Sequence, residues 1–190
     1  MQFVSQTLTD TESEMLSRLT GTSWQFLRSR DVGSPTLAWE RVDVHTSSAV
    51  VSVTLERTPT EIAGDLDDYP SMHVRRAVDH GSVDGATDSM LVFGRGETVT
   101  SVWVLRDTVT AHRMETADFA YEADVMVAFE LETMWIGLSR VSHFSDVLLI
   151  GRGASRDDLV LPQTEEEWDS DLLDQYTIER EWRRVGVPFL

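Results

Sequence analysis

The sequence predicts an α+β fold that is predominantly antiparallel β, with one helix near each end of the chain. Three observations predict it. The segment from Ser23 to Gly153 is rich in Val, Thr and aromatic residues, with stretches of period-two alternation. Capping patterns typical of helices flank that segment on both sides. Two Gly-Arg-Gly stretches with similar surroundings indicate an internal duplication. We therefore expect two related β units that form a barrel-like or sandwich core.

The strands are predicted from short runs bounded by turn residues. Two Gly- and Asp-rich stretches between them, 58–70 and 79–88, are predicted as surface loops. The segments with the strongest strand pattern are 36–45, 49–57, 71–78, 98–106 and 124–132.

The N-terminal segment predicts a helix. Thr9 with Glu12, or Thr11 with Glu14, fits the capping box, in which the two side chains each bond a backbone N–H of the other residue. Gly21 is a suitable helix stop. The two capping alternatives cannot be separated by pattern alone.

The C-terminal segment predicts a second helix. Thr164 is followed by three glutamates, and Arg180, Arg183 and Arg184 come near the end, just before Gly186. Acidic residues early and basic residues late complement the helix dipole. On this basis we expect helix from about Thr164 to the last arginines, with its tryptophans on the core.

The duplication is predicted from four matches in the same order. They pair 23–31 with 101–107, 51–58 with 127–133, 76–82 with 140–145, and finally the Gly-Arg-Gly turns at Gly94 and Gly151. The predicted organisation is one compact domain with a helical segment 1–21, β units 22–97 and 98–153, and a helical segment 154–190. We interpret both Gly-Arg-Gly stretches as turns, because neither opens a helix that would cradle phosphate.

Composition excludes several function classes. The chain holds 33 acidic against 16 basic residues, a formal charge of −17, and contains no Cys and no Lys. It therefore has no disulfide, no thiolate chemistry and no lysine-based catalysis. The charge argues against direct nucleic-acid binding, and it is explained by solubility, by adaptation to high salt or by steering toward a basic partner. With no secretory signal and no long apolar run, a cytoplasmic protein is expected.

Candidate site residues come from the duplication. If a pseudo-twofold axis relates the units, equivalent His and Asp residues converge, where they would bind a ligand or a metal, or act as acid and base. This candidate cluster is His80, His143, Asp84, Asp146, Arg76 and Arg140. No resident metal, no cofactor and no catalytic residue is predicted.

The function that the sequence favours is a small acidic non-catalytic protein-binding module, an inhibitor or immunity-type protein or a subunit of a larger assembly. Its partner is expected to be a protein with a basic surface; no membrane or direct nucleic-acid partner is expected. Two alternatives stay open: a small-molecule- or metal-dependent enzyme with its site between the β units, and a nucleic-acid mimic. The candidate partner contacts are Glu165, Glu166, Glu167 and Asp169.

Overall fold

Two β-sheets and one short helix make up most of the chain. The structure is a computed structural model that describes residues 2–29, 32–33, 37–62, 65–77, 89–113, 116–163, 168 and 175–186. Over these residues the larger sheet has eight strands: β1 (Gln2–Gln6), β3 (Val32–Gly33), β4 (Leu37–Trp39), β9 (Val99–Arg113), β10 (Thr116–Leu131), β11 (Trp135–Arg140), β12 (Val147–Gly153) and β13 (Gln175–Arg184). The smaller sheet has five: β2 (Trp24–Ser29), β5 (Arg41–Thr46), β6 (Val50–Ile62), β7 (Asp65–Arg76) and β8 (Ser89–Leu91).

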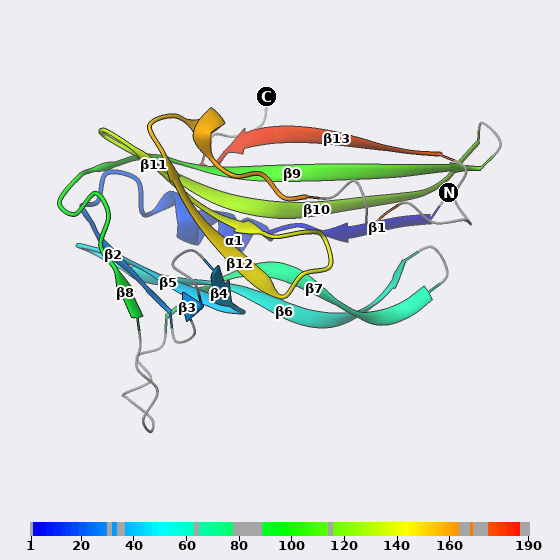
Figure 1. The fold of residues 1–190 in the computed structure, drawn as a ribbon, viewed down its shortest axis with the longest axis horizontal. Helices are drawn as coiled ribbons and strands as arrows, with labels where there is room; N and C mark the ends of the chain where they lie inside the picture. Colours follow the sequence, from blue (N-terminus) through cyan, green and yellow to red (C-terminus); the bar gives the residue numbers. More distant parts are fainter. Residues whose placement is uncertain are drawn as a thin grey trace, which may run out of the picture.

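The strand order makes a two-sheet arrangement and not a barrel. The larger sheet runs β13-β9-β10-β11-β12-β4-β3, and the smaller runs β7-β6-β5-β2-β8. Among the described strands neither order returns to its first member, so the sheets do not close. The β-rich, mainly antiparallel class is thus confirmed; β1, which runs parallel to β10, is an exception. The long strands β9 and β10 extend past the rest, and β1 lies alongside that extension (Figure 1).

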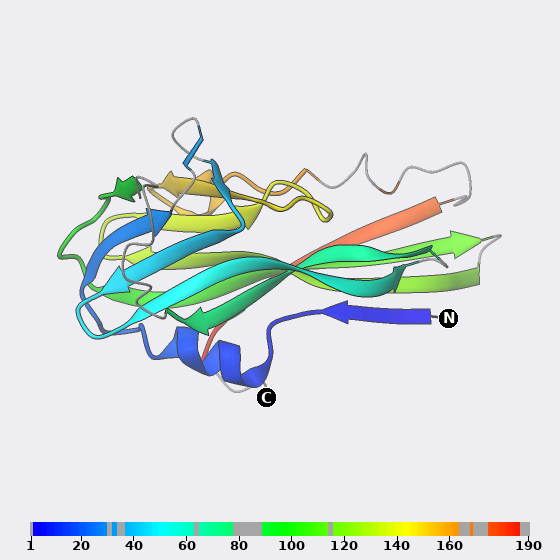
Figure 2. The ribbon, with the colours of Figure 1, turned by 90° about the horizontal axis from the view of Figure 1, so that it is seen from below.

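The N-terminal segment begins with β1 and continues into the helix α1 (Asp10–Ser17). Of the two capping alternatives, the first is formed: Thr9 Oγ1 accepts from the Glu12 amide, and Glu12 accepts from the Thr9 amide at 2.8 Å. The helix lies beside the sheets, and its last residue, Ser17, lies close to Gly186, just after the last strand (Figure 2). It is too short and too polar to cross a membrane, and no helix in the described part of the chain could do so.

Two hydrophobic cores lie on opposite faces of the larger sheet. In β9, Val102 and Val104 point into the core that the two sheets share with α1. Leu105 and Val109 point the other way, into a second core that is covered by residues after β11, such as Leu159 and Trp168, and that also includes Ile62 of the smaller sheet. Alternation along one strand explains this division, because successive side chains leave a strand on opposite faces. We call the first the inner face and the second the outer face.

The predicted C-terminal helix is wrong for residues 175–184, which form strand β13. This strand pairs antiparallel with β9 over its whole length. Tyr176, Ile178 and Trp182 alternate with exposed residues, and their side chains pack on the outer core. The apolar residues therefore follow a period of two, which the charge pattern of a helix conceals. Residues 164–167 and 169–174 lie outside the described part of the chain.

The internal duplication is not confirmed. The matched segments of the first unit, β2 and β6, are separated by β5, whereas their counterparts β9 and β10 are direct neighbours. The matched tryptophans also differ, because Trp24 is fully buried in the inner core and Trp103 is half-buried on the outer face.

The two Gly-Arg-Gly stretches have different structures. Gly94 and Gly96 lie in a turn at positive φ, 56° and 91°. Gly151 and Gly153 instead lie inside β12, where a Cβ on Gly153 would fall 2.4 Å from Cβ of Asp158. The second stretch thus leaves space for the segment that follows it, the short 3-10 helix η1 (Arg156–Asp158).

Candidate functional site

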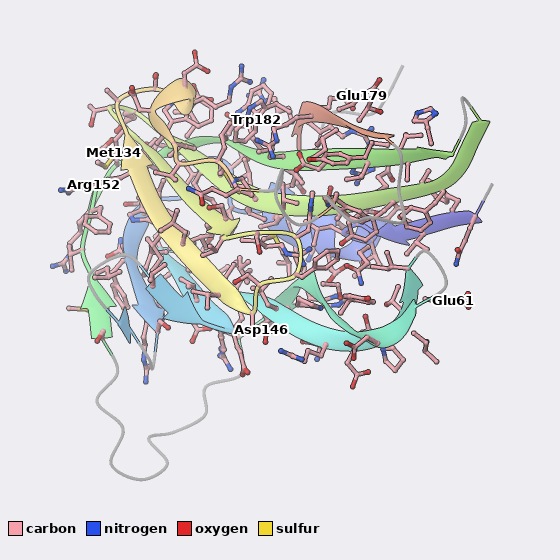
Figure 3. All side chains as sticks on the ribbon, turned by 45° about the vertical axis from the view of Figure 1, so that its right-hand side comes forward. Glu61, Met134, Asp146, Arg152, Glu179 and Trp182 are labelled. Carbon is pink, nitrogen blue, oxygen red and sulfur yellow. The ribbon has the colours of Figure 1, made fainter. Side chains whose placement is uncertain are left out.

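The described residues of the predicted His/Asp/Arg cluster make their printed contacts with other residues and not with one another. Arg76 is exposed at the end of β7. Arg140 is fully buried on the inner face, and Asp146 forms an ion pair with Arg57 of β6. Figure 3 shows Asp146 beside the smaller sheet. His80 and Asp84 lie outside the described residues, as do the predicted partner contacts Glu165, Glu166, Glu167 and Asp169.

His143 belongs to a buried polar chain that links four parts of the molecule. Asp107 of β9, fully buried, accepts two hydrogen bonds from Arg180 of β13, at 2.7 and 2.8 Å. The same carboxylate lies 3.1 Å from Nε2 of His143, and Nε1 of Trp168 donates to Nδ1 of that histidine at 2.8 Å. This Asp107–His143 chain is held by a loop, two strands and the segment before β13.

The donor pattern fixes the proton position on His143. An indole N–H can only donate, so Nδ1 of His143 accepts from Trp168 and carries no proton. The proton therefore lies on Nε2, where it faces Asp107. Burial opposes ionisation of Asp107, but hydrogen bonds from Arg180 and His143 more than offset this and lower its pKa.

Aromatic rings enclose this polar chain. Trp168 lies with its ring centroid 5.2 Å from that of Phe144 and 5.4 Å from that of Tyr121. Phe144 also contacts Tyr69 of the smaller sheet, at 5.1 Å. Because water is excluded on these sides, the charge-assisted bonds to Asp107 gain strength. The Asp107–His143 hydrogen bonds hold the loop 141–146 on β9. Neither the Asp107 carboxylate nor the His143 imidazole is exposed to solvent.

A second carboxylate–imidazole pair joins α1 to β7. Glu12 Oε1 lies 3.0 Å from Nδ1 of His73 and accepts from the Val74 amide at 3.0 Å. Nε2 of His73 lies 2.9 Å from Oγ of Ser71. The order of atoms matches that of a serine hydrolase, yet Ser71 is buried and its hydroxyl also donates to the Glu56 carbonyl at 3.3 Å.

Burial opposes ionisation of Glu12, but hydrogen bonds from His73, Thr9 and Val74 outweigh it and lower its pKa to about 2. The hydrogen bond to Glu12 raises the pKa of His73, although burial partly opposes the rise. The Glu12 carboxylate thus caps α1, pairs with the His73 imidazole and accepts a hydrogen bond from the Val74 amide of β7. We interpret the Glu12–His73 pair as a structural latch.

A cluster of three tryptophans and two arginines lies on the outer face of the larger sheet. Trp103 and Trp135 have ring centroids 6.2 Å apart. Arg156 of η1 lies over two indoles, 5.4 Å from the Trp103 centroid and 5.2 Å from that of Trp182. Arg184 lies 6.0 Å from Trp103. We call these five residues the Trp–Arg face.

The strand register builds the Trp–Arg face. Arg184 stands directly opposite Trp103 across β13 and β9. Ala128 of β10 is opposite Trp103, and Gly137 of β11 is opposite Ala128. The absence of a side chain at Gly137 leaves room for Leu159 and Met126, whose nearest atoms would lie 3.3 Å from a Cβ placed there. The three tryptophans are half-buried, so part of each indole meets solvent.

Sequence reasoning missed most of these groups. Asp107 and Arg180 are far apart in sequence and are brought together by the β13–β9 pairing, which the helix prediction hid. Glu12 was identified only as a capping residue. For the Trp–Arg face the high tryptophan count was a usable signal, since six occur in 190 residues.

The described residues hold no group of three or more His, Cys, Asp or Glu side chains placed to bind a metal ion. Comparison with protein-family models, with curated proteins and with solved structures finds no match to this chain.

Proposed function

We propose that this chain is a non-catalytic protein-binding module, an inhibitor or immunity-type protein or a subunit of an assembly, and that it contacts its partner through the Trp–Arg face. The observation that carries the proposal is the clustering of Trp103, Trp135 and Trp182 with two arginines on one sheet face. Tryptophan and arginine are the residue types most enriched among those that dominate binding energy.

The buried polar groups support a binding role over a catalytic one. Both ring nitrogens of His143 are engaged, and both oxygens of Asp107 are bonded by Arg180 or His143. A general acid or base must reach a substrate proton, and neither group has a free direction to do so. The network instead joins β9, β13 and the loop 141–146, and Arg180 is two residues from Trp182 of the Trp–Arg face.

The partner that fits is a protein with a basic surface. A formal charge of −17 attracts such a protein from a distance and raises the association rate. At contact, Arg156 and Arg184 supply donors for carboxylates or carbonyls of the partner, while the indoles supply apolar area. The acidic residues would thus raise the association rate, whereas the tryptophans and arginines of the Trp–Arg face would hold the bound partner.

Affinity capture from an extract of the source cells tests the proposal. The bait is compared with two variants of the face, Trp182→Ala and Arg156→Glu, and with the control Arg75→Glu, an exposed residue of β7 whose side chain is 62% accessible. Circular dichroism establishes that each variant is folded. Proteins retained by the wild type and by the control, but lost from both face variants, are the candidates.

A candidate partner is then purified and its dissociation constant is measured with the same four proteins. We expect each face variant to weaken binding by at least tenfold, and the control by less than about twofold. A partner that binds all four proteins equally would place the interface elsewhere and overturn the assignment to this face.

A further inference from the structure

Arg140 is the one described arginine that is completely buried. It is the last residue of β11 and stands directly opposite Leu148 of β12, a member of the inner core. Leu138, two residues earlier on the same face, belongs to the same core. The guanidinium therefore lies between the two sheets, where Nη2 donates to the Pro70 carbonyl of β7 at 2.7 Å.

The remaining nitrogens of Arg140 have no partner. Nε and Nη1 are both buried and make no hydrogen bond to any residue that the structure describes. The other arginines with low exposure are handled differently: Arg106 is paired with Asp124, and Arg180 is paired with Asp107. Over the described residues, no carboxylate lies within ion-pair distance of Arg140.

A buried guanidinium in this state lacks two things. Its N–H groups lack acceptors, and its positive charge lacks a counter-charge in a medium of low dielectric constant. The Pro70 carbonyl supplies one acceptor and no charge. Water would supply acceptors only, whereas an anion would supply both.

We propose that Arg140 binds a small monovalent anion, of the size of chloride, between the two sheets. The single positive charge of the guanidinium sets the charge of the ligand. The full burial of Arg140 and the apolar residues beside it set the size, because a large organic anion would have to separate β11 from β7. The bound anion would join the two sheets, since the same guanidinium already bonds β7. This inference is independent of the proposed function.

Stability in different sodium salts tests the site. Melting temperatures of the wild type are measured in chloride and in gluconate at equal ionic strength, up to about 0.5 M, so that general screening is the same in both. We expect the wild type to melt at least about 3 °C higher in chloride. The control Arg75→Met, which removes an exposed arginine, should keep this difference, and Arg140→Met should abolish it. Equal melting temperatures of the wild type in the two salts would overturn the proposal.

A direct measurement covers the case in which Arg140→Met does not fold. The line width of the chloride-35 NMR signal is recorded as wild-type protein is added and as bromide then competes for the site. We expect excess broadening that bromide removes, with the same behaviour in Arg75→Met. If bromide leaves the line width unchanged, no halide is bound and the guanidinium is hydrated by water instead.

Discussion

Arg180 stands directly opposite Asp107 in the β13–β9 register, and its guanidinium makes two hydrogen bonds, of 2.7 and 2.8 Å, to the buried carboxylate. The pair joins β13 to β9, two neighbouring strands of the larger sheet. Because Asp107 is completely buried, its charge depends on this partner.

Removing both members of the pair should therefore cost less than the sum of the two single losses. Arg180→Met leaves a buried carboxylate with His143 alone, and we expect a loss of about 2–4 kcal/mol in the free energy of unfolding. In the double variant with Asp107→Asn, the loss should be smaller than the sum of the single losses by more than about 1 kcal/mol. Urea denaturation of the four proteins measures this, and strictly additive losses would show that the pair is not coupled.

Gly153 and Gly151 offer a matched test of the close packing of the segment 154–159. In Gly153→Ala the new Cβ would lie 2.4 Å from Asp158 Cβ and 2.9 Å from the Ser155 carbonyl oxygen, so the segment must move. In Gly151→Ala the nearest atom would be 3.8 Å away, an ordinary contact. We expect a loss of about 1–3 kcal/mol for the first variant and less than about 0.5 kcal/mol for the second. Equal melting temperatures would mean that η1 does not pack on β12.

The Glu12–His73 latch should depend on pH in two directions. The pKa of Glu12 is lowered from 4.5 to about 2, so its contribution is complete above pH 4.5 and disappears as the pH falls toward 2. The pKa of His73 is raised above 6.5, so its contribution is complete below pH 6.5 and is lost as the pH rises through the folded-state value. The latch should therefore be strongest between pH 4.5 and 6.5.

Two variants separate these contributions. Glu12→Gln should lower stability at pH 6 by roughly 2–3 kcal/mol, and the deficit should vanish near pH 2. His73→Gln should lose most near pH 5.5 and progressively less above pH 7. Chemical denaturation across this range measures both, and a His73→Gln deficit that grows with pH would contradict the assigned sign.

Local signals in the sequence were sufficient for some elements and not for others. The capping box of α1 involves Thr9 and Glu12 alone, so a pattern of neighbours could predict it. The sequence does not predict strand β13 because Arg180 occupies a core-facing position between Ile178 and Trp182. An apolar residue at that position would reveal the period of two. A charge fits there only because Asp107 lies opposite, and sequence spacing does not show that pairing.

Contacts between distant segments also explain why the sequence did not reveal the surroundings of His143. His143 could be singled out as a histidine, but its partners Asp107 and Trp168 come from distant segments. The sequence predicts a turn at the second Gly-Arg-Gly stretch, since it does not show that Gly153 is required by the close approach of Asp158. The sequence thus shows which residue types are present, but it does not show which residues they contact in the folded protein.

Once a partner has been identified, salt should affect the association rate and the dissociation rate differently. Exposed charges are screened beyond about 10 Å at 0.1 M salt, so the association rate should fall steeply as salt is raised, while the dissociation rate changes little. Neutralising Glu165, Glu166, Glu167 and Asp169 together should lower the association rate further. Stopped-flow measurements check both effects; an association rate that ignores salt and this variant would reduce the acidity to a solubility feature.

The most direct test of the proposed interface is hydroxyl-radical footprinting of the protein alone and in complex with its captured partner. Trp103, Trp135 and Trp182 should each be protected by the partner at least threefold or so, as expected for residues at the centre of an interface. Buried Trp24 and exposed Leu66 serve as references and should not change. Protection of Leu66 with the three face tryptophans unchanged would contradict the account.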